Sequence, residues 1–187
     1  PEVMGTPLYF QKLCEDVFPK DKENLTIIEV GTWKGASAFD MINACKQKKC
    51  KMYCVDTWLG SIEHYDTIQR DENGYPSIFN DFWNNVKDAG YEDIITPITL
   101  PSIQAAQYLK NKGVQADIIY IDASHDYKDV LEDMESYWDL LKPGGTFIGD
   151  DYHPDWKGVI NAVRQFIFLK DLECGVFSKT WVIRKKE

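Results

Sequence analysis

Three acidic residues and one histidine follow two apolar segments in the second half of the chain. Asp122 directly follows the segment 116–121, with His125 three residues later, and Asp150 and Asp151 follow a second run, 146–149. If both runs are parallel strands joined by a helix, all three carboxylates reach the same edge of a sheet, where α/β proteins place their sites. Clustered carboxylates repel one another unless they are protonated, hydrogen-bonded or bridged by a cation. An all-oxygen cluster of this kind suits Mg²⁺ above all, with Mn²⁺ or Ca²⁺ as alternatives.

His125 stands three residues beyond Asp122 in the same short loop. An imidazole can take a proton from a hydroxyl group near neutral pH, so His125 is a candidate general base. The alternative is that the residues have local structural roles. Asp150 or Asp151 would then cap the following segment, and Asp122 would support a loop.

A glycine loop and a second acid mark the first half of the chain. Residues 29–35 leave a predicted strand with two glycines four positions apart, which lets the backbone turn sharply and approach a ligand. The loop lacks the third glycine of dinucleotide dehydrogenases and the Gly-Lys-Ser/Thr of P-loops. Glu29 is a carboxylate in an apolar strand and needs a partner there. Asp56 ends the next strand, where a carboxylate can accept the ribose hydroxyls of a nucleoside, although it could also be a cap.

The composition narrows the class of protein. A chain of 187 residues without an apolar run of about 20 residues suggests one soluble domain. The net charge of −9 argues against nucleic acid as a partner, and the absence of any apolar span argues against a membrane. Five unpatterned cysteines suit a reducing compartment rather than zinc or disulfides. We therefore expect a cytoplasmic protein, with a homodimer or a domain of a longer polypeptide as possible forms. The lack of an initiator Met fits an excised fragment.

Apolar periodicity alternates between strand and helix along the chain. It predicts helices over 6–18, 36–48, 77–89, 102–112, between Tyr127 and Leu141, and over 156–169. It predicts strands over 25–30, 51–56, 94–99, 116–121 and 146–149, and one or two closing strands within 173–184 whose turn the sequence does not place. This order predicts a single α/β domain with a doubly wound, mostly parallel sheet and helices on both faces. We divide it into an N-terminal helix and loop (1–24), a core (25–170), and closing strands with a basic tail (171–187).

Four motifs carry a family resemblance. They are E-V-G-T-W-K-G-A-S at 29–37, V-D-T-W at 55–58, I-D-A-S-H-D-Y at 121–127 and L-L-K-P-G-G-T-F-I-G-D-D-Y at 140–152. Together they resemble the class I S-adenosylmethionine-dependent methyltransferases, which have a Rossmann-like fold. Within that class the chain is most similar to small metal-dependent O-methyltransferases, including the macrolide-sugar and catechol branches. The resemblance covers roughly residues 25–170.

The resemblance implies roles for individual residues. It implies that S-adenosylmethionine contacts Glu29, Gly31, Thr32, Trp33, Gly35, Ser37, Asp56, Thr57, Ser102 and Asp122. Within that set, Asp56 matches the ribose-binding acid and Ser102 matches a residue at the adenine edge. It further implies a divalent cation on Asp122, Asp150 and Asp151, with His125 as the base.

The sequence says less about the molecule that accepts the methyl group, the acceptor. Its determinants should lie in 57–76 and 152–156, and the candidates there are Arg70, Tyr75, Tyr152 and His153, with His64 in the same long loop as the first two. We expect O-methylation of a hydroxyl group on a small molecule or saccharide. Two alternatives stay open: a metal-independent methyltransferase of the same fold, or a non-catalytic protein that binds S-adenosylmethionine.

Overall fold

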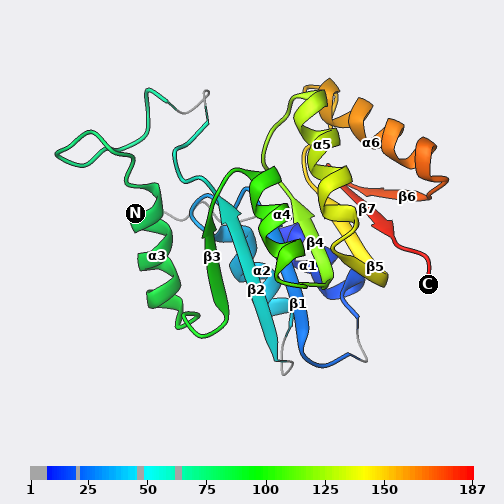
Figure 1. Ribbon diagram of the computed structural model, residues 1–187, viewed down its shortest axis with the longest axis horizontal. Coiled ribbons are helices and arrows are strands. Elements are labelled where there is room, and N and C mark those ends of the chain that lie inside the picture. The colour runs from blue at the N-terminus through cyan, green and yellow to red at the C-terminus, as the bar shows by residue number, and fades with distance from the viewer. Residues whose placement is uncertain (1–7, 20–21, 46–48, 62–64) are drawn as a thin grey trace.

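The structure is a computed structural model that describes residues 8–19, 22–45, 49–61 and 65–187. Its strands are β1 (Leu25–Val30), β2 (Cys50–Asp56), β3 (Ile95–Thr99), β4 (Ala116–Ile121), β5 (Leu141–Gly149), β6 (Cys174–Phe177) and β7 (Thr180–Arg184). They form one sheet in the order β3-β2-β1-β4-β5-β7-β6 (Figure 1). The strands β1 to β5 are parallel, whereas β7 runs antiparallel to both β5 and β6.

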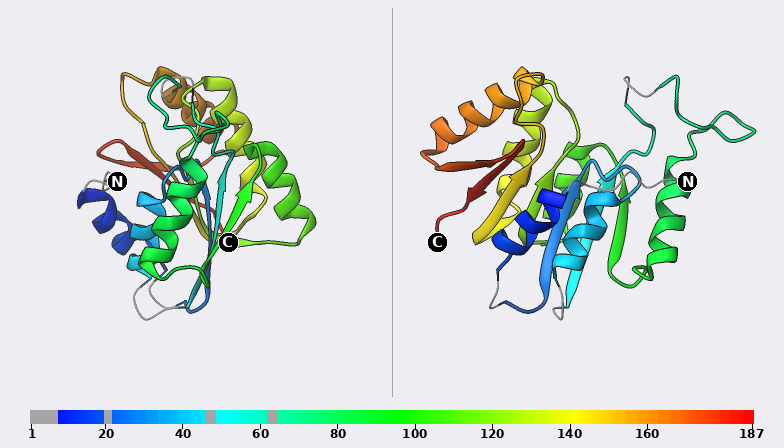
Figure 2. Two further views of the ribbon diagram at one scale, coloured as in Figure 1. Left: turned by 90° about the vertical axis from the view of Figure 1, so that its left-hand side faces the viewer. Right: turned by 180° about the vertical axis from the view of Figure 1, so that it is seen from behind.

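Helices cover both faces of this sheet. They are α1 (Leu8–Val17), α2 (Ala36–Ala44), α3 (Ile78–Ala89), α4 (Ser102–Asn111), α5 (Tyr127–Trp138) and α6 (Lys157–Lys170). The apolar faces of α1, α2 and α3 pack on one side of the sheet, and those of α4, α5 and α6 pack on the other (Figure 2). Strand β4 is buried at every position, as a central parallel strand covered on both faces should be. The predicted doubly wound α/β fold is confirmed.

Two predicted boundaries differ from the structure by more than three residues. The fifth strand begins at Leu141 rather than at residue 146, because Leu141 already pairs with Ala116 before a shift in register. The glycines between them bond to the chain end instead: the Gly144 N–H donates to the Lys185 carbonyl, and the Lys185 N–H donates to the Gly145 carbonyl. Helix α2 ends at Ala44, and the last residues of the predicted helix, 46–48, lie outside the described residues.

The strand order places the site. The chain order reverses between β1 and β4, and ligands of open α/β sheets bind at the carboxyl ends of the strands on either side of such a point. Because β7 is antiparallel, its start lies beside the carboxyl end of β5, where its second residue, Trp181, pairs with Gly149. The turn between β6 and β7 therefore lies at the same edge of the sheet.

None of the described helices is long and apolar enough to cross a membrane.

Candidate active site

The glycine loop brings the ends of β1 and β4 into close contact. Gly31 has a φ of +89°, and its N–H donates to the Val55 carbonyl at 2.9 Å. A Cβ atom on Gly31 would lie 1.9 Å from the backbone oxygen of Asp122, so no other residue fits there. Gly35, just before α2, also has a positive φ, of +93°. These two glycines are therefore needed for the fold of the loop itself.

Glu29 is a buried acid at the start of this loop. Its side chain is fully buried in β1, and the Ser37 hydroxyl donates to its Oε1 atom, while Thr32 is buried nearby in the loop. Its Oε2 atom accepts no hydrogen bond from the residues that the structure describes. Burial raises the pKa of Glu29 to about 8, against the opposing effect of the bond from Ser37. A ligand ammonium group would supply the missing donor, so this site fits the amino-acid end of S-adenosylmethionine.

Asp56 at the end of β2 is held by backbone donors. The N–H groups of Trp33 and Trp58 donate to its two oxygens at 2.8 and 2.7 Å. The Trp58 indole N–H also donates to the Trp33 carbonyl at 2.7 Å, which closes the loop around the acid. Burial raises the pKa of Asp56, and these backbone bonds oppose that rise. Each carboxylate oxygen can accept a further bond, so Asp56 fits the predicted ribose contact. Its neighbour Thr57 is exposed.

Ser102 begins α4 and is bound to α5. The Tyr137 hydroxyl donates to its carbonyl at 2.8 Å. Its side chain bonds the buried carboxyl of Asp133, whose pKa burial raises to about 6 despite that bond. The hydroxyl of Ser102 therefore points to a partner within the protein, and its predicted contact with adenine stays a prediction.

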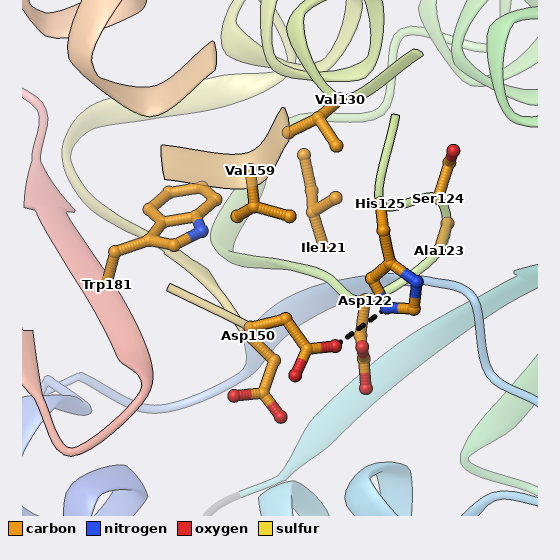
Figure 3. A pocket seen from close by; sticks show the side chains of 10 residues that line it. Ile121, Asp122, Ala123, Ser124, His125, Val130, Asp150, Val159 and Trp181 are labelled. Atoms are coloured by element: carbon orange, nitrogen blue, oxygen red, sulfur yellow. Dashed lines mark hydrogen bonds and ion pairs between the residues drawn. The ribbon is translucent and has the colours of Figure 1, made fainter. Parts of the chain in front are cut away.

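The three predicted acids converge on one pocket at the ends of β4 and β5 (Figure 3). The pocket is lined by Ile121, Asp122, Ala123, Ser124, His125, Val130, Asp150, Asp151, Val159 and Trp181. Burial, then the negative charges of Asp150 and Asp151, raise the pKa of Asp122 to about 7. The sequence therefore located the acids correctly at one edge of the sheet.

His125 has a fixed orientation in this pocket. Its Nε2 atom lies 2.8 Å from Oδ2 of Asp151. Its ring stacks on Trp156, with ring centroids 3.7 Å apart and planes inclined by 19°. Gly158 at the start of α6 packs against the backbone of the same loop, because a Cβ atom there would lie 2.2 Å from the His125 oxygen. Both the side chain and the backbone of His125 are thus held in place.

Lys179 is a site residue that the sequence analysis missed. Its Nζ atom lies 3.0 Å from Oδ2 of Asp150 and 3.1 Å from Oδ1 of Asp151. Burial alone would lower the pKa of Lys179, but its bonds to the two acids outweigh burial and raise that pKa. The neighbouring Thr180 hydroxyl donates to Oδ1 of Asp150 at 3.2 Å. The sequence predicted closing strands within 173–184 but did not place the turn between them. Without the position of that turn, Lys179 and Thr180 could not be placed beside the acids.

The predicted acceptor residues fall into two separate places. Arg70 donates to the Gly74 carbonyl at 3.1 Å, and Tyr75 is 69% exposed. Both lie on the segment 65–77, which extends from the β3 side of the sheet and away from β5 and β7 (Figure 1). His64, in the same loop, lies outside the described residues.

The other two candidates follow the acid cluster along the chain. Tyr152 is half-buried, and its hydroxyl accepts a bond from Arg164 at 3.3 Å. His153 is exposed and pairs with Asp155 at 3.2 Å. Of the four described candidates, only Tyr152 and His153 directly follow Asp151 in the chain. Neither lines the pocket of the three acids, and their contact with an acceptor stays a prediction.

Comparisons with known proteins agree with this geometry. Residues 28–152 match a family described as a methyltransferase domain. The chain is 30% identical over 162 residues to the uncharacterized protein R132 of Acanthamoeba polyphaga mimivirus; the match covers 84% of this chain but only 65% of that protein. The chain thus spans slightly less than two thirds of the length of this curated relative.

Solved structures share the fold at low sequence identity. An O-methyltransferase from Bacillus cereus in complex with SAH is 17% identical, with a TM-score of 0.67 over 100% of this chain and 84% of that one. The O-methyltransferase NovP is 13% identical, with a TM-score of 0.69 over 96% of this chain and 78% of that one. Because the family match covers more than half of the chain, this protein belongs to the methyltransferase-domain family and has the fold of the class I S-adenosylmethionine-dependent enzymes.

Proposed function

We propose that this protein transfers the methyl group of S-adenosylmethionine to a hydroxyl oxygen of a small molecule or saccharide, with His125 as the general base. The observation that carries the proposal is the pair of His125 and Asp151 in the pocket at the ends of β4 and β5. The glycine loop, Glu29 and Asp56 hold the donor at the neighbouring strand ends. The two O-methyltransferases named above, which share the fold, support transfer to oxygen.

The protein contributes binding, orientation and proton transfer to this reaction. When bound, S-adenosylmethionine supplies a methyl group on a sulfonium, so that a carbon–sulfur bond breaks as a carbon–oxygen bond forms. Asp151 accepts a bond from the Nε2–H tautomer of His125, which puts the ring's lone pair on Nδ1. That nitrogen takes the hydroxyl proton, and positioning of the two reactants provides most of the remaining rate.

The divalent cation that the sequence predicts does not fit the side chains as they lie. Among the described residues, no group of three His, Cys, Asp or Glu side chains could hold a metal ion. More directly, all four oxygens of Asp150 and Asp151 already bond within the protein, to Lys179, Thr180 and His125. The proposed reaction therefore has no step through a metal.

Aromatic side chains support a ring-shaped acceptor. The ring of Trp156 stacks on that of His125, and Trp156 and Tyr152 are both partly buried beside the core that underlies the pocket. Aromatic faces pack well against the apolar face of a sugar or against a flat phenol. We propose these two classes, and sugars first, as the acceptors to be screened.

The test combines an acceptor screen with variants of His125. The protein, S-adenosylmethionine and each acceptor are incubated, and a mass gain of one methyl group identifies the substrate. In His125→Ala, we expect turnover to fall by about 10²- to 10⁴-fold, with the affinity for S-adenosylhomocysteine changed less than about threefold. His125→Gln keeps an amide donor toward Asp151 but cannot take the proton, so it should be equally slow. Turnover near that of the wild type in either variant would remove His125 as the base.

A further inference from the structure

The ammonium group of Lys179 lies between two acids of the proposed active site. It is 3.0 Å from an oxygen of Asp150 and 3.1 Å from an oxygen of Asp151. The side chains of the two acids are 13% and 17% exposed, whereas that of Lys179 is 38% exposed. The lysine therefore reaches into the cluster from its solvent side and carries a positive charge to the point where the acids meet.

Two further donors complete the bonding of the acid pair. Thr180, whose side chain is buried, donates to the second oxygen of Asp150, and His125 bonds the second oxygen of Asp151. A divalent cation on these acids would have to displace Lys179 or approach an ammonium group within a few ångströms. Repulsion between two cations at such a distance, in a partly buried site, is strong. The lysine and a metal therefore exclude each other.

The fold holds Lys179 in this place. The residue before it, Ser178, has a φ of +59°, a conformation that costs a non-glycine residue about 1 kcal/mol or more. The N–H of Tyr152 donates to the Lys179 carbonyl at 2.7 Å, which ties the turn to the segment after β5. On β7, the ring of Trp181 packs directly over Gly149, where a Cβ atom would lie 2.1 Å from the ring. This is a fixed hairpin, unlike a mobile surface ion pair.

We propose that Lys179 is the built-in cation of this site: its ammonium group takes the place that a divalent metal would occupy, so the protein needs no divalent cation. Lys179 neutralises Asp150 and Asp151 and holds the Asp151 carboxylate in position for His125. The part of this inference that concerns turnover rests on the proposed methyl transfer. The part that concerns metal exclusion does not.

Metal exclusion is tested with Mn²⁺ alone, by electron paramagnetic resonance. We expect the wild type to bind Mn²⁺ only weakly, with a Kd above about 1 mM, because the ammonium group occupies the site. Lys179→Met keeps the length of the side chain but removes its charge, and should bind Mn²⁺ at least about tenfold more tightly. Lys179→Arg keeps the charge and should exclude Mn²⁺ as the wild type does. Adding Asp150→Asn to Lys179→Met should abolish the new binding, which places the ion at these acids.

Turnover is tested with the acceptor that the screen identifies. The wild type should keep its full rate in excess chelator, whereas Lys179→Met should lose at least about tenfold in turnover with S-adenosylhomocysteine affinity unchanged. Added Mg²⁺ or Mn²⁺ should restore part of the rate of Lys179→Met and none of the rate of His125→Ala. Lys110→Met is the matched control, because Lys110 forms an exposed ion pair with Asp139 at 3.0 Å on the surface of α4. It should match the wild type in every assay.

Three results would overturn the proposal. One is sub-millimolar Mn²⁺ binding by the wild type that Asp150→Asn removes, a measurement that needs no lysine variant to fold. Another is Mn²⁺ binding by folded Lys179→Met that is no tighter than that of the wild type. The third is loss of wild-type turnover in chelator. If instead no acceptor gains a methyl group, the proposed function fails, while the Mn²⁺ measurements still decide the role of Lys179.

Discussion

The two halves of the sheet edge satisfy their polar groups in different ways. At the ends of β1 and β2, the carboxylate of Asp56 accepts backbone N–H groups from Trp33 and Trp58. At the ends of β4 and β5, Asp150 and Asp151 are instead bonded by side chains, which lie 26 to 30 residues away along the chain. Asp56 is thus held by backbone donors, whereas Asp150 and Asp151 belong to a network of side-chain charges.

This difference suggests a division of labour. A backbone cradle has a shape that changes little with the side chains around it, which suits a ligand that is the same in every turnover. A network of charged side chains can hold and move a proton, which suits the reacting half of the site. Substitutions in the first half should therefore change stability and cofactor affinity, and substitutions in the second half should change turnover.

The largest effect is expected at the contact between the halves. Gly31→Ala places a methyl group within 1.9 Å of the Asp122 backbone oxygen at a φ of +89°, so we expect a loss of about 4 kcal/mol in the free energy of unfolding. Gly74→Ala is the matched control, since Gly74 has a φ of +84° but nothing within 4 Å of an added Cβ atom. It should lose only about 1 kcal/mol. Urea unfolding measures both, and equal losses would mean that the halves are not in rigid contact.

A second effect distinguishes the buried acid of the first half from the ion-paired acids of the second. Burial raises the pKa of Glu29 from 4.5 to about 8, so between these pH values the folded protein keeps a proton that the unfolded chain loses. Stability from this residue is therefore present at low pH and is lost as the pH rises through that window. Glu29→Gln lacks this loss. From pH 5 to pH 8, the wild type should lose on the order of 3 kcal/mol relative to Glu29→Gln in urea unfolding. Parallel pH curves would show that Glu29 is ionised in the folded protein.

Much of the fold could be predicted from the sequence because each strand and helix has its own local pattern of apolar residues. The alternation of buried strands and amphipathic helices gave the doubly wound class, and the parallel strands then placed Asp122 and Asp150 at one edge. The start of β5 at Leu141 was missed because it depends on pairing with Ala116 across a shift in register. Such a shift leaves no periodic signal in the sequence.

The site was predictable to the extent that its residues follow strands. Glu29 and Asp56 end up where the strand ends put them, and their loop glycines have the positive φ angles that their residue type suggests. Lys179 was missed because its place depends on a turn with a non-glycine residue, Ser178, at a positive φ. Turn prediction relies on Gly, Asn or Asp at such positions, so a serine there gave no warning.

The same substitution in each half gives the sharpest test of the division of labour. Asp56→Asn replaces one acceptor with a donor that faces the N–H groups of Trp33 and Trp58, so the loop should open around the proposed ribose site. We expect S-adenosylhomocysteine affinity to fall about 30- to 100-fold, measured by calorimetry. Asp151→Asn changes the partner of His125 instead. It should leave that affinity within about threefold of the wild type and lower turnover by about 30- to 100-fold.

The two variants also separate a division of labour from simple damage to the fold. General loosening would lower affinity and turnover together in both variants, and unfolding midpoints would fall in parallel. If Asp151→Asn weakened cofactor binding as much as Asp56→Asn does, the charge network would be part of the cofactor-binding site. A different result would support the division of labour: folded Asp56→Asn loses cofactor affinity, and folded Asp151→Asn loses turnover. Each residue would then affect only the process in which its own partners take part. The half bonded by backbone groups would bind the methyl donor, and the half bonded by side chains would move the proton.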